Sequence, residues 1–205
     1  MTTPVNQSLL SERALAQRER ILEAARRCFV EHGFHAASMA TIAETAQMSP
    51  GLIYRYFDSK NAIIVAIIEQ QLKASRDSIS SLHQSSDMGD TMIRTFEFWR
   101  NGEPSMMNAS LFLEISAEAR RDAKIAQALH SFDLEMRKEL ANWLCADPAA
   151  GGKGIPKEVG TARALSLQIF FEGLAARAVR EPDLDQEVLK TAIAEFLEGL
   201  FARDK

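Results

Sequence analysis

SMATIAETAQMSPGLIYRYFDSK, residues 38–60, has the pattern of two short helices joined by a tight turn. Ser38 is a typical N-cap residue. The apolar residues that follow it recur at the spacing of one helical face and are Met39, Ile42, Ala43 and Ala46. Ser49 followed by Pro50 predicts a second helix start, because proline at the first helical position lacks only an N–H that would have no partner there. The segment therefore predicts a helix-turn-helix.

The second helix is predicted to bury one face and to expose the other. Ile53 and Phe57 lie one turn apart and are expected to face inward. The residues expected to point outward or along the rim are Leu52, Arg55 and the hydroxyl ends of Tyr54 and Tyr56. Gly51 would let a phosphate approach the helix N-terminus, where free N–H groups and the helix dipole favour an anion. An exposed edge of this kind is typical of a DNA-reading helix.

We predict two kinds of DNA contact for this edge. The candidate phosphate contacts, which would fix the register and supply affinity, are Tyr54, Tyr56 and Lys60. Arg55 is the candidate for reading a base in the major groove, with help from Leu52 and from the Pro50–Gly51 edge. The alternative is that SPGLIYRYF, residues 49–57, is only a capped helix with aromatic core residues.

Residues 18–64 resemble the DNA-binding domain of the TetR family of transcriptional repressors. The positions that carry the resemblance are Ile21, Leu22, Ala24, Ala25, Phe29, Gly33, Phe34, Ile42, Ala43, Ala46, Ser49, Gly51, Tyr54, Tyr56, Phe57, Ser59 and Lys60. The resemblance implies three N-terminal helices that read DNA and a larger helical C-terminal domain that binds a small ligand and dimerises. The positions for which it implies backbone or phosphate contacts are Gly51, Tyr54, Tyr56 and Lys60. Those it places near the DNA are Thr41, Leu52 and Arg55.

Two residues depart from the pattern of this family. Gln47 stands where the turn most often carries glycine, and a left-handed conformation costs a non-glycine residue about 1 kcal/mol. Asn61 replaces the acidic residue that usually follows the Ser59–Lys60 pair. The first turn of the next helix then loses roughly a few tenths of a kcal/mol of dipole compensation, which Asp58 would partly restore.

The whole chain is predicted to be all-α, because no segment alternates apolar and polar residues with a period of two. The longer helices are expected near residues 12–32, 59–80, 90–100, 105–119, 122–145, 157–181 and 184–203. Gly33 is expected to end the first of these, and Ser59 to cap the second. We expect a helix-turn-helix DNA-binding domain over residues 1–60 and a helical ligand-binding and dimerisation domain over residues 61–205.

The last two predicted helices are apolar on more than one face. The apolar residues of the first are Leu165, Ile169, Phe170 and Leu174. Those of the second are Val188, Leu189, Ile193, Phe196, Leu197, Leu200 and Phe201. One side can pack on its own domain, and the other suits a four-helix interface in a homodimer, with a monomeric core as the alternative. A dimer would place two reading helices about 34–36 Å apart on a pseudo-palindrome.

Large soft side chains in the middle of the chain predict an apolar cavity for a small-molecule effector. The residues predicted to line it are Phe96, Trp99, Met107, Phe112, Glu114, Phe132, Phe170 and Phe171. Glu114, Glu118 or Glu172 would give the cavity an acidic point for a cationic amphiphile. The alternatives are that the aromatic residues are core, and that Glu114 and Glu118 lie exposed on a helix surface.

The charge of the chain gives weak support to a nucleic-acid partner. The net charge of −4 opposes nonspecific affinity for DNA. Residues 1–60, however, hold seven basic and six acidic residues, a net charge of +1, which leaves −5 for the rest of the chain. Arg13, Arg18 and Arg20 would either lie along the phosphate backbone or form a solvated face.

We predict no catalytic residue, no metal site and no cofactor. Gly151–Gly154 has no strand before it and no serine or threonine after its lysine, so a flexible linker is expected rather than a phosphate loop. The four histidines are scattered, and no helix carries a Glu-x-x-His pair. Cys28 and Cys145 are expected to be small buried hydrophobes rather than a disulfide.

The chain is expected to be cytoplasmic and to have no membrane partner. It opens without a basic and then apolar signal segment, and its purest apolar run, residues 62–68, is too short to span a bilayer. The function predicted is that of a ligand-responsive transcriptional repressor that binds a pseudo-palindromic operator as a dimer. An apolar or cationic amphiphilic molecule would release it. The competing interpretation is a ligand-binding interaction protein without operator function.

Overall fold

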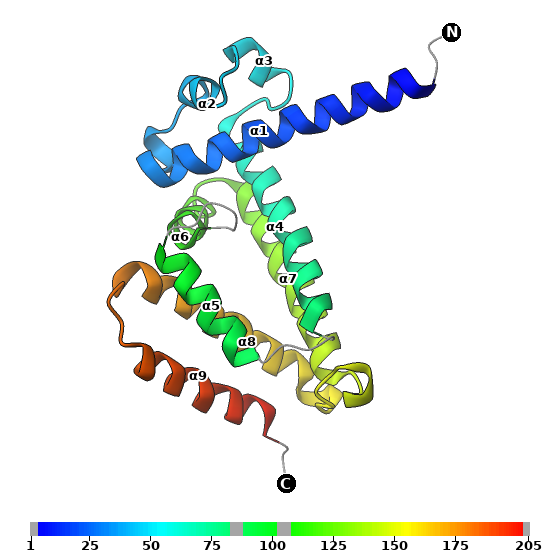
Figure 1. Cartoon of the computed structure of the whole chain (residues 1–205), viewed down its shortest axis with the longest axis vertical. Helices are drawn as coiled ribbons and strands as arrows, with labels where there is room; N and C mark the ends of the chain where they lie inside the picture. The colour runs from blue at the N-terminus through cyan, green and yellow to red at the C-terminus, as the bar shows by residue number, and fades with distance from the viewer. Residues whose placement is uncertain (1–3, 83–87, 102–107, 203–205) are drawn as a thin grey trace.

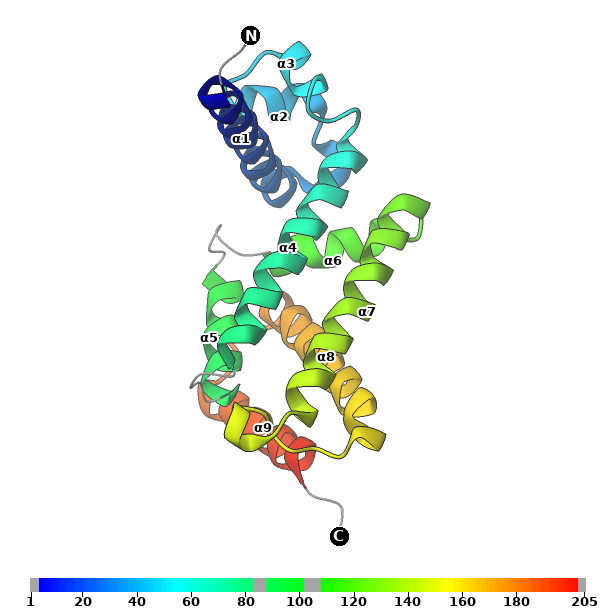
Figure 2. The ribbon, with the colours of Figure 1, turned by 90° about the vertical axis from the view of Figure 1, so that its right-hand side faces the viewer.

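The computed structural model describes the backbone of residues 4–82, 88–101 and 108–202, and side chains within 12–75, 88–101 and 108–202. Over these residues it contains helices and no strand, which confirms the predicted all-α class. The helices are α1 (Pro4–Ala36), α2 (Met39–Thr45), α3 (Pro50–Tyr54), α4 (Lys60–Leu82), α5 (Met88–Asn101), α6 (Ala109–Glu118), α7 (Ala123–Cys145), η1 (Pro148–Ala150, a 3-10 turn), α8 (Lys157–Arg180) and α9 (Gln186–Phe201). Helices α1–α3 form a head, and α4 runs beside α7 from the head to the other helices (Figures 1 and 2).

The helix starts predicted in and after the head are confirmed by their caps. A serine side-chain oxygen accepts a backbone N–H at each start: Ser38 from Thr41 (3.0 Å), Ser49 from Leu52 (3.3 Å) and Ser59 from Ala62 (3.1 Å). Each bond satisfies an N–H that has no partner within its own helix. The local sequence therefore fixes where α2, α3 and α4 begin.

Helix α1 is longer than the helix predicted over residues 12–32. It begins at Pro4, a residue that suits a first helical turn. The predicted break occurs at Gly33, where φ is 76° and ψ is 161°, and one further turn then reaches Ala36. Just beyond the break, the backbone N–H of Phe34 donates to the carboxylate of Glu114 in α6.

The turn between α2 and α3 has the predicted left-handed residue, because the φ of Gln47 is 54°. Arg20 of α1 holds this turn by donating from Nη2 to the carbonyl of Ala46 at 2.7 Å. The guanidinium of Arg18 lies over the ring of Phe57, 4.4 Å from its centroid. Two of the three arginines considered for the phosphate backbone therefore also have contacts inside the head.

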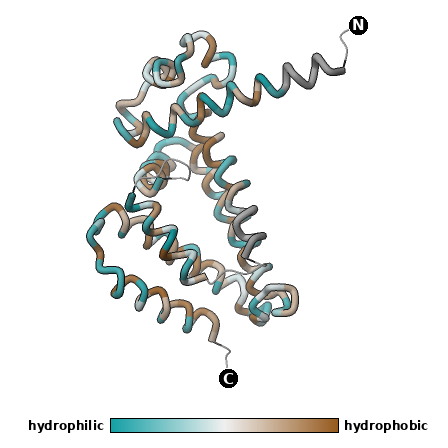
Figure 3. The backbone as a smooth tube through the Cα atoms, viewed as in Figure 1, coloured by the Kyte–Doolittle hydropathy of each residue, from teal (hydrophilic) through white to brown (hydrophobic). Residues whose placement is uncertain are grey.

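Two apolar cores hold the chain together. The first joins the head to α4, α6 and α7, and its largest fully buried side chains include Ile21, Leu22, Phe29, Ile42, Ile53, Ile63, Ile64, Ile67 and Ile68. Figure 3 shows that the apolar residues of α4 are concentrated where it joins the head. The second core joins α5, α7, α8 and α9 around Met92, Phe96, Trp143 and Leu167. The head is therefore packed on the C-terminal helices, and the domain boundary at residue 60 stays a prediction.

The glycine-rich segment after α7 is not the flexible linker that we predicted. The indole Nε1 of Trp143 donates to the carbonyl of Gly151 at 3.2 Å, and the N–H of Ile155 donates to the carbonyl of Leu144 at 2.9 Å. Gly151 has a left-handed φ of 80°, which lets the chain turn back on α7. Backbone hydrogen bonds over a short range thus fold the segment into a turn.

The remaining helix boundaries differ from the predictions by a few residues. Helix α6 begins at Ala109 rather than near 105, because Asn108 is its N-cap and accepts the N–H of Ser110 at 2.8 Å. Both cysteines are free, as predicted, with Cys28 buried and Cys145 half-buried.

Asn61 has a structural role that the sequence did not indicate. Its Nδ2 donates to Oδ2 of Asp122 at 2.5 Å, which ties the start of α4 to the start of α7. Asp122 is also the N-cap of α7. The N–H of Ile125 and then the amide of Asn61 hold the pKa of Asp122 below its ordinary value of 3.8.

We expect the Asn61→Ala variant to be less stable than the parent protein near neutral pH, and the difference to narrow in acid. A carboxylate whose pKa is lowered on folding contributes stability above its unfolded pKa and loses it as the pH falls through the folded pKa. Urea unfolding at pH 6 and at about pH 3 measures the difference. If the parent and Asn61→Ala proteins differed by the same free energy of unfolding at both pH values, the contact between Asn61 and the Asp122 carboxylate would be contradicted.

Candidate nucleic-acid interface

Helix α3 separates a buried face from an exposed edge, as predicted. Ile53 is fully buried and Phe57 nearly so, and both belong to the first core. Tyr54 has 54% of its surface exposed, although it is a large aromatic residue. Arg55 is exposed beside it. The core therefore holds α3 rigidly while its polar edge faces outward.

The eight residues predicted to contact DNA fall into two groups in the structure. The exposed ones are Pro50, Gly51, Tyr54 and Arg55, and the half-buried ones are Thr41, Leu52, Tyr56 and Lys60. Tyr56 packs against the first core, and the hydroxyl of Thr41 lies 2.8 Å from that of Ser38. The first group lies on α3 and at its C-cap, Arg55, whereas the second group is spread over α2, α3, the segment that follows α3 and the start of α4.

Gly51 has no conformational or packing role that the structure reveals. A Cβ built on Gly51 would meet no other atom of the protein within 4 Å. The φ of Gly51 is not among the positive values that favour glycine. The missing side chain therefore leaves open space at the outer edge of the head, where another molecule can approach the backbone.

Replacing Gly51 by alanine should separate stability from DNA binding. We expect the free energy of unfolding to stay the same or to rise by up to about 1 kcal/mol, because alanine favours helix over glycine. Affinity for DNA should fall, because the new methyl group meets the incoming phosphate. Urea unfolding and DNA titration of the same preparation test this. An unchanged affinity for DNA would contradict the approach of a phosphate to the backbone at Gly51.

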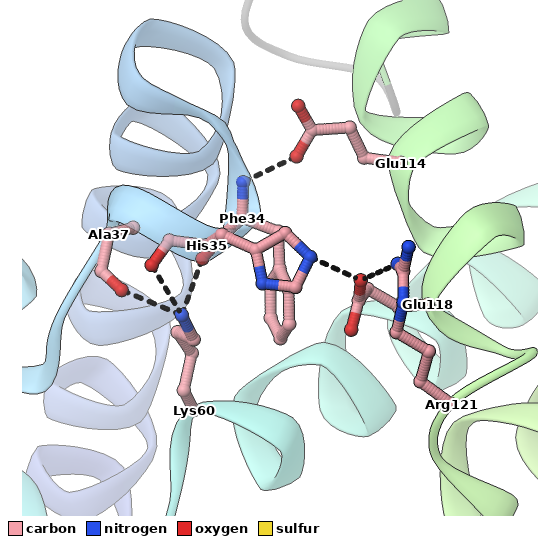
Figure 4. A network of polar contacts seen from close by, with 7 residues as sticks. All are labelled: Phe34, His35, Ala37, Lys60, Glu114, Glu118 and Arg121. Carbon is pink, nitrogen blue, oxygen red and sulfur yellow. Dashed lines mark hydrogen bonds and ion pairs between the residues drawn. The ribbon is translucent and has the colours of Figure 1, made fainter.

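Lys60 has contacts inside the protein that sequence reasoning missed. Its ammonium group donates to the carbonyls of Phe34, His35 and Ala37 at the end of α1, and it lies over the ring of Phe34 (Figure 4). Partial burial lowers the pKa of Lys60, and the carboxylates of Glu118 and Glu114 oppose that shift. The structure thus uses Lys60 to join α4 to α1, and a phosphate contact of Lys60 stays a prediction.

Two carboxylates of α6 lie against the same turn of the head. Glu114 accepts the N–H of Phe34, and Glu118 lies 2.9 Å from Nε2 of His35 and 2.7 Å from Nη1 of Arg121 (Figure 4). Glu118 is only 6% exposed, so the expectation of an exposed Glu118 was wrong. Glu114 lies where α6 meets the head, and its predicted role in an effector cavity stays a prediction. Phe34 and His35 are too distant from α6 in the sequence for any local pattern to reveal these two contacts, whereas Glu118 and Arg121 are an i,i+3 pair on the chain.

The other residues predicted to line the effector cavity do not gather in one place. Those that belong to the second core or pack against it are Phe96, Trp99, Phe112, Phe170 and Phe171. Phe132 packs against the first core, and Met107 lies outside the described residues. The core alternative fits the burial of Phe96, and an effector role for these residues stays a prediction.

A cluster of polar side chains lies between α7 and α8. Arg137 donates from Nε to Gln168 at 2.9 Å, and Gln168 donates to the carbonyl of Asp133 at 3.0 Å. Burial raises the pKa of the Asp133 carboxyl, and it also raises the pKa of Glu172, with a further contribution from the charge of Asp133. Glu172 therefore stays a candidate acidic point, as does Glu114.

Helices α8 and α9 carry an exposed apolar face. Leu165, Ile169 and Val188 expose 38%, 58% and 60% of their surfaces. The rings of Phe170 and Phe196 stack with centroids 3.9 Å apart. A groove of about 470 Å³ is lined by Ser166, Ile169, Phe170, Gly173, Leu174, Arg177 and Phe196. An apolar face of this kind indicates a surface that another protein covers.

The part of the chain that the structure describes has neither a metal-ion cluster nor a membrane-spanning helix. No three histidine, cysteine, aspartate or glutamate side chains there are placed to hold a metal ion. None of the described helices has the length and apolar character needed to cross a membrane.

Comparisons with known proteins agree with this geometry. Residues 21–67 match the family described as "Bacterial regulatory proteins, tetR family". The chain is 31% identical over 190 residues to the HTH-type transcriptional regulator UidR of Escherichia coli K12, covering 90% of this chain and 89% of UidR. It is 30% identical over 171 residues to the HTH-type transcriptional repressor AcnR of Corynebacterium efficiens, covering 81% and 84%. The solved structure of Salmonella enterica GusR superposes with a TM-score of 0.68 at 27% identity, covering 91% and 96%.

Proposed function

The chain belongs to the TetR family of transcriptional regulators, and we propose that it is a cytoplasmic, ligand-responsive repressor that binds a pseudo-palindromic operator as a homodimer. Repression is proposed because AcnR, a relative at 30% identity, is a transcriptional repressor. The single observation that carries the proposal is the exposed edge of α3, which the buried Ile53 and Phe57 hold rigidly.

The edge of α3 supplies groups suited to both kinds of DNA contact. Arg55 is exposed and can donate two parallel hydrogen bonds to a guanine edge. Tyr54 and the N-terminal backbone at Gly51 are proposed to contact phosphates. The half-buried Thr41, Leu52 and Tyr56 are proposed to complete the contact with the groove.

The exposed face of α8 and α9 supports the dimer. Its apolar side chains would be buried in a symmetric four-helix contact, in which the same residues of both copies meet. The head lies at the opposite end of the molecule from this face (Figure 1). Two copies related by a twofold axis that runs along the long direction of the molecule would carry both heads on the same side of the assembly, as a pseudo-palindrome requires.

The proposed effector is a small molecule with an apolar part and a cationic group. Support comes from the aromatic side chains at the second core and from two neighbouring carboxyls, the half-buried Asp133 on α7 and the exposed Glu172 on α8. Its binding would favour a spacing of the heads that does not fit the operator. A ligand needs a difference of only a few kcal/mol between the two states to release the DNA.

Selection of genomic DNA fragments by the purified protein tests the proposal. We expect recovery of a duplex with two related half-sites, bound at least about 1,000-fold more tightly than unrelated DNA. The Tyr54→Ala, Arg55→Ala double variant should lose this selectivity. A library of apolar and cationic compounds is then screened for release of the recovered duplex.

The competing function is that of a ligand-binding interaction protein without an operator. That function would be favoured if the purified dimer bound all DNA equally weakly and yet bound compounds from the same library. The two functions therefore give opposite results in the fragment selection.

A further inference from the structure

Helix α6 is shared between the two cores of the molecule. Leu111 and Ile115 are fully buried in the core that contains the head, and Ala109 belongs to the second core. A helix that is packed into two cores fixes the position of one core relative to the other better than a loop does. The charged groups at its surface therefore have fixed places relative to both parts of the chain.

Among the described residues, the polar contacts of α6 with the head are made to Phe34 and His35, two consecutive residues near the end of α1. Glu114 accepts the N–H of Phe34, and Glu118 pairs with His35. Ser38, the N-cap of α2, follows three residues after His35. The same stretch of backbone also accepts the ammonium group of Lys60 at the start of α4. Helices α1, α2, α4 and α6 thus meet at residues 34–38.

In these contacts Glu118 is buried and Glu114 half-buried, whereas the side chains of His35 and Arg121 are 72% and 62% exposed. Hydrogen bonds to ionised groups are roughly twice as strong as those between neutral groups. Glu118 is nearly fully buried and shares its carboxylate between His35 and Arg121. Removal of either glutamate should therefore loosen the attachment of the head, while the apolar contacts around Ile115 remain.

We propose that Glu114 and Glu118 are positioning residues for operator recognition: they fix the head on the C-terminal helices and so set the half-site spacing that the dimer accepts. The inference rests on the proposed function, since spacing has meaning only for a protein with two reading heads. One base pair more or less between half-sites rotates one of them by about a tenth of a helical turn. A rigid head rejects this change, whereas a loosened head adapts to it.

The test compares operators of different spacing. The duplex recovered by the fragment selection is used as found, and with one base pair inserted or removed at its centre. The variants are Glu114→Met, Glu114→Met with Glu118→Met, and Glu114→Gln, in which the amide oxygen still accepts the N–H of Phe34. The matched control is Glu69→Met, since Glu69 is exposed on α4 and lies outside the contacts.

We expect the parent protein, Glu69→Met and Glu114→Gln to lose at least about tenfold in affinity for the altered spacings. The Glu114→Met protein and the double variant should lose less than about threefold. A variant that is only less stable would bind every spacing more weakly and would keep the parent ratio. An unchanged ratio in Glu114→Met would therefore overturn the proposal.

Amide hydrogen exchange supplies a readout that does not depend on an operator. Exchange at residues 33–37 should accelerate in Glu114→Met, while peptides of α8 and α9 stay unchanged. The same exchange in both proteins would also overturn the proposal, even if the double variant fails to fold. Absence of selective DNA binding by the parent protein would contradict the proposed function instead.

Discussion

Replacing Ile169 by aspartate is expected to make the protein monomeric and to weaken operator binding by at least about 100-fold. Ile169 is 58% exposed on α8 and lines the groove beside the stacked rings of Phe170 and Phe196. A symmetric contact would bury two copies of the new carboxylate in apolar surroundings, where an unpaired charge is costly. A single head then binds without the avidity of two, which is worth about 10²–10⁴ in affinity.

Light scattering after size-exclusion chromatography measures the mass, and titration with the operator duplex measures the affinity. The matched control is Val30→Asp, because Val30 is also an exposed apolar residue, at 43%, but lies on α1. That variant should stay dimeric. A dimeric Ile169→Asp protein would show that α8 is not the interface.

The head was predictable from the sequence because its determinants are local. The serines at 38, 49 and 59 mark three helix starts, and each accepts an N–H within three residues. The one-turn spacing of Ile53 and Phe57 identified the buried face of α3, and both residues are buried. Caps and helical periodicity act over a few residues, so the local sequence contains the information needed.

The contacts of α6 were not predictable, because they join residues far apart in the chain. Glu114 and Phe34 are separated by 80 residues, and no pattern near either residue indicates the other. Lys60 likewise reaches back to α1, because the packing of α4 on the head places its ammonium group there. Charged residues on a helix surface look the same in sequence whether water or another helix covers them.

The effector residues depend on long-range packing in the same way, and their role stays a prediction. An aromatic side chain suits a core and a cavity equally, and only packing separates the two. Phe96 is fully buried, whereas Phe170 stacks on Phe196 beside the exposed groove. The sequence pattern predicted the helices that carry these residues. It did not show which of their side chains pack against one another.

Replacing Arg55 by alanine is expected to change which sequence the protein prefers, and to weaken binding of the preferred duplex by about 5- to 150-fold. A bidentate contact of arginine with a guanine edge is worth about 1–3 kcal/mol, and its loss relaxes specificity at that base pair. Arg55 is exposed next to the rigid Ile53, so its removal leaves the core of the head intact. Selection from randomised half-sites, at one salt concentration, measures the preference.

Two variants separate base reading from general electrostatic attraction. Tyr54→Phe removes a candidate phosphate contact and should weaken all sequences by a similar factor, since phosphates carry no sequence information. Arg94→Ala removes the same charge as Arg55→Ala from an exposed site on α5, away from the head, and should change neither affinity nor preference. If Arg55→Ala selected the same half-site as the parent protein, Arg55 would contribute only charge, and base reading would have to come from other residues of the α3 edge.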